Sequence, residues 1–443
     1  MKNISNKLLA LCITLLSVSS FAEPLELTII GGSYNEGIPV AVVPFKVVGG
    51  DSPGKISKVI YDDLKLTGKF KMFTASDFPE QPSSAAELNV KAWRAKKIEN
   101  VVVGQISKGP KGYTIKMELI NVYGKIGDTS GSSGKKLAET TKIVIKANLR
   151  LKAHQISNLI YKALTGIDGV FDTRIAYIRA SKNKRGKRHY QLIVADADGH
   201  NAKVIRNSAN PMLSLSWSPN GKQLAYVAYR SNGRTAIYIQ TIATNKRRLI
   251  SSFKGINGAP RFSADGSRLA LTLSKYGNPE ICTFDLRTRR LKRLTFNTAI
   301  DTEPSWSPNG RNIIFTSDRS GRQQLYRVSA NGGRAVRITH RGRSSARGIY
   351  SPNGKQIAME HNSGSGKFSI GLKAVGSSNI TVLTDGRLDE SPSFAANGQM
   401  LIFASEYNRR GVLTLVSIDG KAKFRLKQQS GDIREAVWGP KRR

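Results

Sequence analysis

The sequence predicts a small α/β domain followed by an all-β propeller of six blades, closed by the C-terminal strand joining the first blade. An aromatic residue followed by a tight turn recurs every 44 or 45 residues in the second part of the chain, and an apolar run follows most of these turns. The first part shows helical and strand patterns without a repeat. A period of this length in β-rich sequence is typical of four-stranded propeller blades.

The first 22 residues have the composition of an export signal. Two lysines precede an apolar run from Leu8 to Val18, and Ser20-Phe21-Ala22 forms a small-x-small cleavage site. The run is too short for a membrane helix, which needs about 20 apolar residues, and no later segment approaches that length. We therefore expect a mature chain that begins at Glu23, does not span a membrane and lies outside the cytoplasm.

Residues 23–168 are expected to form the α/β domain. The pattern predicts strands at PVAVVPF, VVVGQI and YTIKMEL, which start at residues 39, 101 and 113. One helical face is formed by Ile56, Val59, Ile60 and Leu64. A last amphipathic helix follows Asn148 and ends at Thr165-Gly166, and the Gly- and Ser-rich residues 124–136 are expected to form a flexible loop.

Residues 169–443 are expected to form the propeller. The repeated aromatic residues are Trp217, Phe262, Trp306, Tyr350, Phe394 and Trp438. The first apolar run, at Arg174, has no aromatic phrase before it, and the phrase at Trp438 has no apolar run after it. These two incomplete copies of the repeat form one blade if the C-terminal strand joins the first blade. This closure also removes the exposed strand edges of an open ring.

The order of strands assigns the connections to two faces of the disc. If the aromatic strand is innermost, the loops that lead into it lie on one face, here called the loop face, and the Pro-Asn-Gly turns lie on the other, here called the turn face. In the segments just before the inner strands, acidic residues outnumber basic ones. The two basic residues there are Arg347 and Arg434, and the six acidic residues are Asp301, Glu303, Asp389, Glu390, Asp432 and Glu435. Basic loops that start at residues 181, 229, 317 and 406 surround them, and we call these loops the basic rim.

An acidic mouth inside a basic rim favours a surface that docks a protein, because complementary charge steers and selects partners. The alternative is that the acids cap turns and the bases keep exposed hairpins soluble. The formal charge of +39 comes from 70 Lys and Arg against 31 Asp and Glu. In an exported protein this charge points to anionic envelope polymers or an acidic partner rather than to nucleic acid, or simply to solubility.

The sequence shows no motif for catalysis, a cofactor or a metal. No G-x-S-x-G nucleophile elbow occurs, and the histidines are scattered. The stretch GGDSPGKIS at residues 49–57 is similar to a phosphate loop, but Ile56 stands where Ser or Thr must bind magnesium. Cys282, left alone once the signal with Cys12 is removed, is expected to be a buried, inert thiol.

An export signal, a small α/β domain and a six-bladed propeller together resemble the TolB family of the Tol-Pal system in Gram-negative envelopes. The more specific shared pieces are IPVAVVPF, INGAP before FSADG, and DTEPSWSPNG. The resemblance implies a non-enzymatic periplasmic adaptor that supports outer-membrane integrity and envelope constriction at cell division. It also implies that the lipoprotein Pal binds at the propeller channel mouth and that TolA binds the N-terminus.

The resemblance assigns residues to both partners by motif match. The implied Pal contacts are Asn257, Ala259, Thr302, Glu303, Asp389 and Glu390. The implied TolA segment is Glu23, Pro24, Leu25 and Glu26, which would otherwise fold back on its own domain. The alternative function is enzymatic: the chain would be the propeller part of a peptidase-like or glycan-acting envelope enzyme, and the basic rim would bind an anionic polymer.

Overall fold

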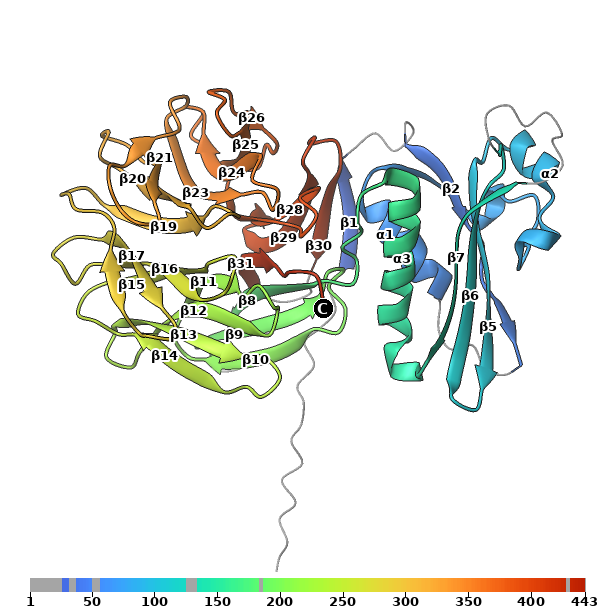
Figure 1. The fold of residues 1–443 in the computed structure, drawn as a ribbon, viewed down its shortest axis with the longest axis horizontal. Coiled ribbons are helices and arrows are strands. Elements are labelled where there is room, and N and C mark those ends of the chain that lie inside the picture. Colours follow the sequence, from blue (N-terminus) through green and yellow to red (C-terminus); the bar gives the residue numbers. More distant parts are fainter. Residues whose placement is uncertain are drawn as a thin grey trace, which may run out of the picture.

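The computed structural model describes residues 26–31, 37–49, 56–124, 134–182, 186–427 and 431–442. Figure 1 shows the propeller and the α/β domain side by side. The export signal, Glu23 to Leu25, residues 50–55 of the GGDSPGKIS stretch and residues 125–133 of the Gly- and Ser-rich loop lie outside the described residues. Within the part of the chain that the structure describes, no helix combines the length and apolar character that crossing a bilayer requires.

The α/β domain is one mixed sheet with helices on both faces. Its strands are β2 (Ile38–Val42), β3 (Lys46–Val48), β4 (Phe70–Phe73), β5 (Asn100–Gly109), β6 (Gly112–Asn121) and β7 (Lys135–Val144). Its α-helices are α1 (Ile56–Leu66), α2 (Val90–Ala95) and α3 (Leu149–Thr165). The sheet order is β4-β2-β5-β6-β7, with β3 paired to β5. Helices α1 and α3 bury their apolar sides against one face, and Trp93 of α2 is buried against the other.

The predicted strands and the helices α1 and α3 of this domain are present. Helix α3 ends where expected, because Gly166 has a φ of 72° and its N–H donates to the Lys162 carbonyl at 2.8 Å. Strand β7 was not predicted, and its first two residues, Lys135 and Lys136, fall in the segment expected to be loop. Strand β7 is an edge strand with mostly exposed side chains, so it lacks the apolar alternation that marks a buried strand.

The propeller has six antiparallel blades, as predicted, and each inner strand carries the repeated aromatic residue. Blade 2 is β11 (Met212–Trp217), β12 (Gln223–Tyr229), β13 (Thr235–Thr241) and β14 (Arg247–Ser251). Blade 3 is β15 (Asn257–Phe262), β16 (Arg268–Leu273), β17 (Glu280–Asp285) and β18 (Leu291–Arg293). Blade 4 is β19 (Asp301–Trp306), β20 (Asn312–Ser317), β21 (Gln324–Ser329) and β22 (Val336–Arg337). Blade 5 is β23 (Ser344–Tyr350), β24 (Gln356–Asn362), β25 (Ser369–Ala374) and β26 (Thr381–Val382).

The ring closes between the last strand and the first blade, which confirms the predicted closure. Blade 1 is β31 (Asp432–Trp438), β8 (Arg174–Lys182), β9 (Arg188–Asp196) and β10 (Lys203–Ser208). Trp438 pairs with Ile175, and its indole N–H donates to Thr173 Oγ1 at 2.8 Å. Trp217 and Trp306 likewise donate to carbonyls of the preceding inner strand, at Val437 and Arg261, so these tryptophans join blades.

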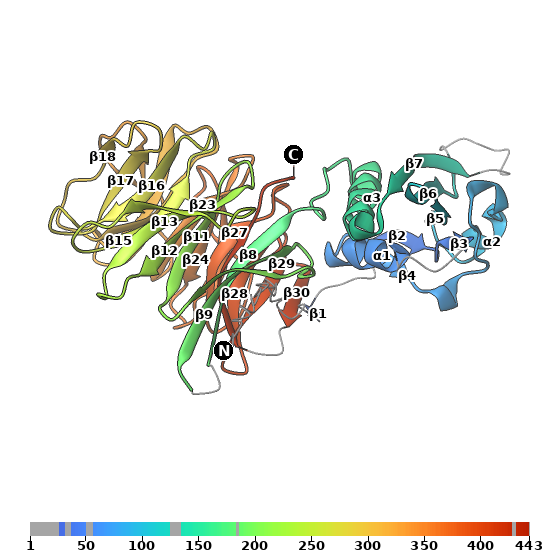
Figure 2. The same ribbon diagram turned by 90° about the horizontal axis from the view of Figure 1, so that it is seen from below.

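Blade 6 carries an additional outer strand from the start of the chain. It consists of β27 (Asp389–Phe394), β28 (Met400–Tyr407), β29 (Arg410–Ser417), β30 (Lys423–Lys427) and β1 (Glu26–Gly31). Strand β1 runs antiparallel to β30, with Glu26 opposite Lys427 and Ile29 opposite Phe424 (Figures 1 and 2). The described part of the N-terminal segment therefore pairs with the propeller, and folding back on its own domain is not what the structure shows. The pairing is non-local, so no pattern near residue 26 could predict it.

The α/β domain meets the propeller at the turn face of blades 1 and 6. Helices α1 and α3 lie between the sheet of the α/β domain and the propeller (Figures 1 and 2). Asn397, in the turn after β27, donates to the Asp168 carbonyl at 2.9 Å, and Lys441 pairs with the Asp168 carboxylate at 2.6 Å. These contacts leave the loop face of the propeller uncovered by the α/β domain.

Candidate docking site

The six inner strands share a bulge that places one residue of each blade at the same level of the central channel. The ladder to the second strand is irregular at this point in each blade. The bulged residues have positive φ between 46° and 56°, and they are Ser214, Ala259, Glu303, Arg347, Ser391 and Glu435. We call these six residues the channel ring. Non-glycine residues seldom adopt this conformation, which recurs where a strand must redirect a side chain.

Arg347 is the electrostatic centre of the channel ring. Its Nε lies 2.7 Å from Glu303 Oε1 of blade 4 and 3.4 Å from Glu360 Oε1 of its own blade, and its Nη1 lies 3.5 Å from Glu435 Oε1 of blade 1. Burial opposes the charge of Arg347, yet the three carboxylates raise its pKa above its ordinary value. For the Glu360 carboxyl, burial acts in the other direction and raises the pKa to about 7. One arginine thus neutralises much of the acidity that the sequence places at the mouth.

Two other acids counted in the expected acidic mouth are internal. Asp301 is fully buried and accepts from Arg319 Nη2 at 2.6 Å, so an arginine of the basic rim turns inward to pair with it. Asp389 is 1% exposed and accepts from Ser405 Oγ at 2.6 Å, and burial raises its pKa. Neither carboxylate is available to a partner in this conformation. Both hold the residues that lead into an inner strand.

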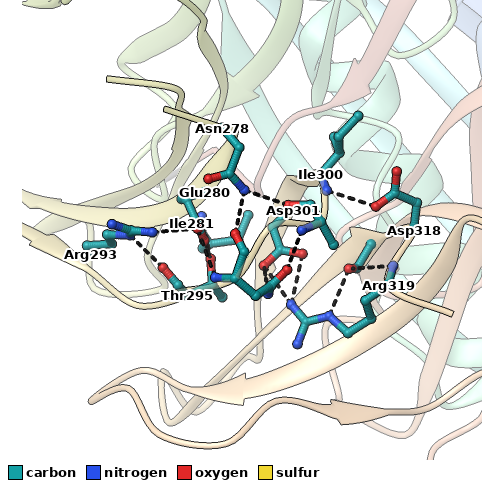
Figure 3. Close-up of polar contacts among 12 residues, drawn as sticks. Asn278, Glu280, Ile281, Arg293, Thr295, Ile300, Asp301, Asp318 and Arg319 are labelled. Atoms are coloured by element: carbon teal, nitrogen blue, oxygen red, sulfur yellow. Dashed lines mark hydrogen bonds and ion pairs between the residues drawn. The ribbon is translucent and has the colours of Figure 1, made fainter. Parts of the chain in front are cut away.

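A polar network fixes the loop that leads into β19 (Figure 3). The buried Glu280 accepts from Arg293 Nη2 at 2.6 Å and from the Asn297 N–H at 3.1 Å. Asn278 donates to the carbonyls of Asn297 and Ala299 at 2.6 and 2.8 Å. Because the loop backbone is hydrogen-bonded at several points, its apolar side chains are held outward rather than collapsing onto the blade.

These loops display a cluster of exposed apolar side chains on the loop face of blades 3 and 4. The exposed fractions are 38% for Phe253, 47% for Ile256, 39% for Tyr276, 71% for Phe296 and 50% for Ile300. We call these five residues the loop-face patch. Lys275 lies 4.2 Å from the centre of the Phe253 ring, and Arg293 lies 4.6 Å from that of Phe296. Exposed aromatic residues beside arginine are the composition of protein-binding hot spots.

The loop-face patch was not predicted from the sequence, because only the charged residues of these loops were compared. A signal was nevertheless present. Ile256 and Ile300 stand directly before the inner strands of neighbouring blades, 44 residues apart, where an apolar residue has no strand to stabilise. A large apolar residue repeated at a loop position is better explained by contact with a partner than by packing.

The structure gives different surroundings to the six residues assigned to Pal. Ala259, Thr302 and Glu303 are half-buried at or beside the channel ring, next to the loop-face patch. Asn257 is fully buried, accepts from the Phe253 N–H at 2.9 Å and donates to the Phe253 carbonyl at 2.8 Å, so it shapes the loop that carries Phe253. Asp389 and the half-buried Glu390 belong to blade 6 and are separate from the other four in the ring of blades.

One of the scattered histidines, His154, lies between two aspartates, a contact that spacing in the sequence did not predict. Asp63, His154 and Asp198 bring their ligand atoms within 4.8 Å of one another where α1 and α3 meet blade 1. His154 is buried, with Nδ1 2.8 Å from Asp63 and Nε2 3.5 Å from Asp198. Burial opposes the charge on the ring, but the two carboxylates raise the pKa of His154. The Arg150 guanidinium pairs with Asp198 and opposes a metal cation, so the cluster is suited to joining the domains.

The fold and this surface define a class of protein: a six-bladed propeller with an appended α/β domain and an open face suited to protein docking. Residues 161–442 match the family model described as the TolB beta propeller domain, and residues 25–126 match the TolB amino-terminal domain. The chain belongs to the TolB family. The family consists of Tol-Pal system proteins and not of enzymes, so the alternative of an envelope-degrading enzyme is set aside.

Individual relatives agree with this assignment. The chain is 44% identical to the Tol-Pal system protein TolB of Alcanivorax borkumensis over 406 residues, 91% of either chain. It is 40% identical to that of Escherichia fergusonii over 233 residues, an alignment that spans about half (52%) of either chain. The crystal structure of TolB from Acinetobacter baumannii superposes with a TM-score of 0.85 at 36% identity, covering 94% of this chain and 100% of that one.

Proposed function

We propose that this protein is a periplasmic, non-enzymatic adaptor of the Tol-Pal system, which binds Pal through the loop face of its propeller and TolA through its N-terminal segment. In this role it supports outer-membrane integrity and envelope constriction at cell division. The proposal is supported by membership of the TolB family, by the export signal and by the surface on blades 3 and 4.

The observation that carries the Pal assignment is the loop-face patch beside the channel ring. Phe296 and Ile300 are largely exposed although a hydrogen-bonded loop holds them in place, so little ordering entropy opposes binding. In the proposal, these side chains insert into pockets of Pal, and Ala259, Thr302 and Glu303 contact Pal at the channel. Asn257 and Asp389 act as positioning residues, and Glu390 contributes from blade 6.

The TolA assignment concerns Glu23, Pro24, Leu25 and Glu26. Glu26 begins β1, which occupies the outer edge of β30. Strand β1 pairs one edge of its backbone with β30, so the N–H and C=O groups of that edge are not available to another protein. In the proposal, TolA binds Glu23 to Glu26 together with the rest of β1 and displaces β1 from β30.

The basic rim is a weaker candidate for contact with anionic envelope polymers. Its residues 183–185 lie outside the described part of the chain, and Arg319 is committed to Asp301. Arg230 and Arg234 in the blade 2 hairpin and Arg409 and Arg410 in the blade 6 hairpin are exposed, and they are the rim residues proposed for such a contact.

Calorimetric titration with the soluble domain of Pal from the same cell tests the Pal assignment. We expect Phe296→Ala to weaken binding about tenfold or more, because a central aromatic anchor contributes above 1 kcal/mol. Val382→Ala is the matched control, because Val382 is also exposed (48%) but lies on β26, the outer strand of blade 5. Equal affinities for wild type and for a Phe296→Ala, Ile300→Ala double variant would remove the loop-face patch from the interface.

A further inference from the structure

A pocket lies on the turn face of the propeller, opposite the loop-face patch, where blade 1 meets blade 2. It has a volume of about 280 Å³ and is built from the start of β8, the turn after β11 and the chain beyond β31. Four of the side chains that line it are cationic: Arg174, Lys222, Lys441 and Arg442. The ring of Trp217 forms one wall.

Arg174 is held in a defined orientation in this pocket. It is half-buried, its Nη2 donates to the Gly221 carbonyl at 2.5 Å, and its guanidinium lies 5.2 Å from the centre of the Trp217 ring. Burial lowers the pKa of Arg174, and the charge of Arg442 lowers it further, against a smaller opposing effect of Asp196. Two cationic groups, Arg174 and Arg442, therefore act on each other in this pocket.

The carboxylates near the pocket do not balance its cations. Asp196 is engaged by Arg442, and Asp168 is shared between Lys441 at 2.6 Å and Lys162 at 2.9 Å. Among the described residues, Arg174 and Lys222 have no carboxylate within ion-pair distance. An arginine held by a hydrogen bond and by its contact with Trp217, next to the exposed Lys222, is a donor set that suits phosphate oxygens.

We propose that this turn-face pocket binds a phosphate group, either as free inorganic phosphate or as the headgroup of an anionic phospholipid. The inference does not depend on Pal binding, because the two sites lie on opposite faces of the disc and can be occupied together. A protein that docks a partner on one face and an anionic group on the other would be oriented between them.

Titration with inorganic phosphate, followed by ³¹P line broadening at low ionic strength, tests the pocket. Lys222→Gln should weaken binding about three- to fivefold, the effect of one exposed charge, and Lys222→Gln with Arg442→Gln should weaken it more than tenfold. Lys355→Gln is the matched control, because Lys355 follows the equivalent turn in blade 5 and is also exposed. Phosphate affinity that responds equally to Lys222→Gln and Lys355→Gln, or to neither, would overturn the proposal.

Co-sedimentation with vesicles distinguishes the two sources of phosphate. Binding to phosphatidylglycerol vesicles, absent with phosphatidylcholine and lost in the double variant, would assign the pocket to a lipid headgroup. Phosphate binding without any vesicle binding would assign it to free phosphate. Vesicle binding that survives in the double variant, together with unchanged phosphate affinity, would show that general surface charge is responsible and that the pocket is not a site.

Discussion

Glu360 is a channel carboxylate, and burial raises its pKa to about 7. Replacing Glu360 by glutamine should therefore change how the stability of the protein depends on pH. A carboxyl whose pKa is higher in the folded protein binds more protons there than in the unfolded chain, so stability falls as pH rises between the two values. The difference between about 7 and the ordinary value of 4.5 corresponds to about 3 kcal/mol. The wild type should lose about this much between pH 4.5 and pH 8 because of Glu360.

Glutamine preserves the shape of Glu360 and can still accept the 2.7 Å hydrogen bond from the Ser391 N–H. The free energy of unfolding of Glu360→Gln minus that of wild type should therefore be about 3 kcal/mol larger at pH 8 than at pH 4.5, because the variant does not lose this stability. Urea unfolding followed by tryptophan fluorescence at several pH values measures this difference. Glu139→Gln, on the exposed edge strand β7, is the control and should follow the wild-type curve. Parallel curves for Glu360→Gln and wild type would refute the reasoning.

Three further changes have expected outcomes. Trp438→Ala removes a buried ring and its bond to Thr173, and it should lower the free energy of unfolding by about 3–5 kcal/mol in thermal or urea melts; a loss below 1 kcal/mol would contradict closure through β31. Oxidation of a Thr28→Cys, Arg425→Cys variant should lock β1 to β30, because these residues are register partners, and should abolish TolA capture until reductant is added; TolA capture by the locked form would separate its site from β1. Glu390→Lys should weaken Pal binding at least fivefold with an unchanged melting temperature, and unchanged affinity would exclude blade 6 from the interface.

The propeller could be predicted because its determinants are local and repeated. Pro-Asn-Gly and Asp-Gly turns form the connections after the inner strands, and the apolar runs that follow them are long enough to be recognised as strands. Ring closure could be predicted because the repeat is incomplete at both ends. The apolar run at Arg174 lacks an aromatic phrase before it, and the phrase at Trp438 lacks an apolar run after it. The same arguments do not apply to β1, whose partner lies almost 400 residues away in sequence.

The candidate site could be predicted only in part. A count of acidic and basic residues in a sequence segment does not show which of them form ion pairs in the folded protein. Of the acids before the inner strands, Glu303 and Glu435 belong to the channel ring, whereas Asp301 and Asp389 are buried. Arg347 pairs with three carboxylates from three blades, and Arg319 of the basic rim pairs with Asp301. The contact of His154 with Asp63 likewise joins two helices that are distant in sequence. Such pairings depend on the packing of blades and domains.

Hydrogen–deuterium exchange of the chain with and without the soluble domain of Pal tests the central claim most directly, because it locates the partner without any substitution. The account predicts protection of residues 252–259 and 296–303 on the loop face, with weaker protection of residues 387–391. The turns at residues 219–221 and 308–310 on the turn face should exchange as in the free protein. Protection of those turns, with residues 296–303 unchanged, would contradict the assignment of Pal to the loop face.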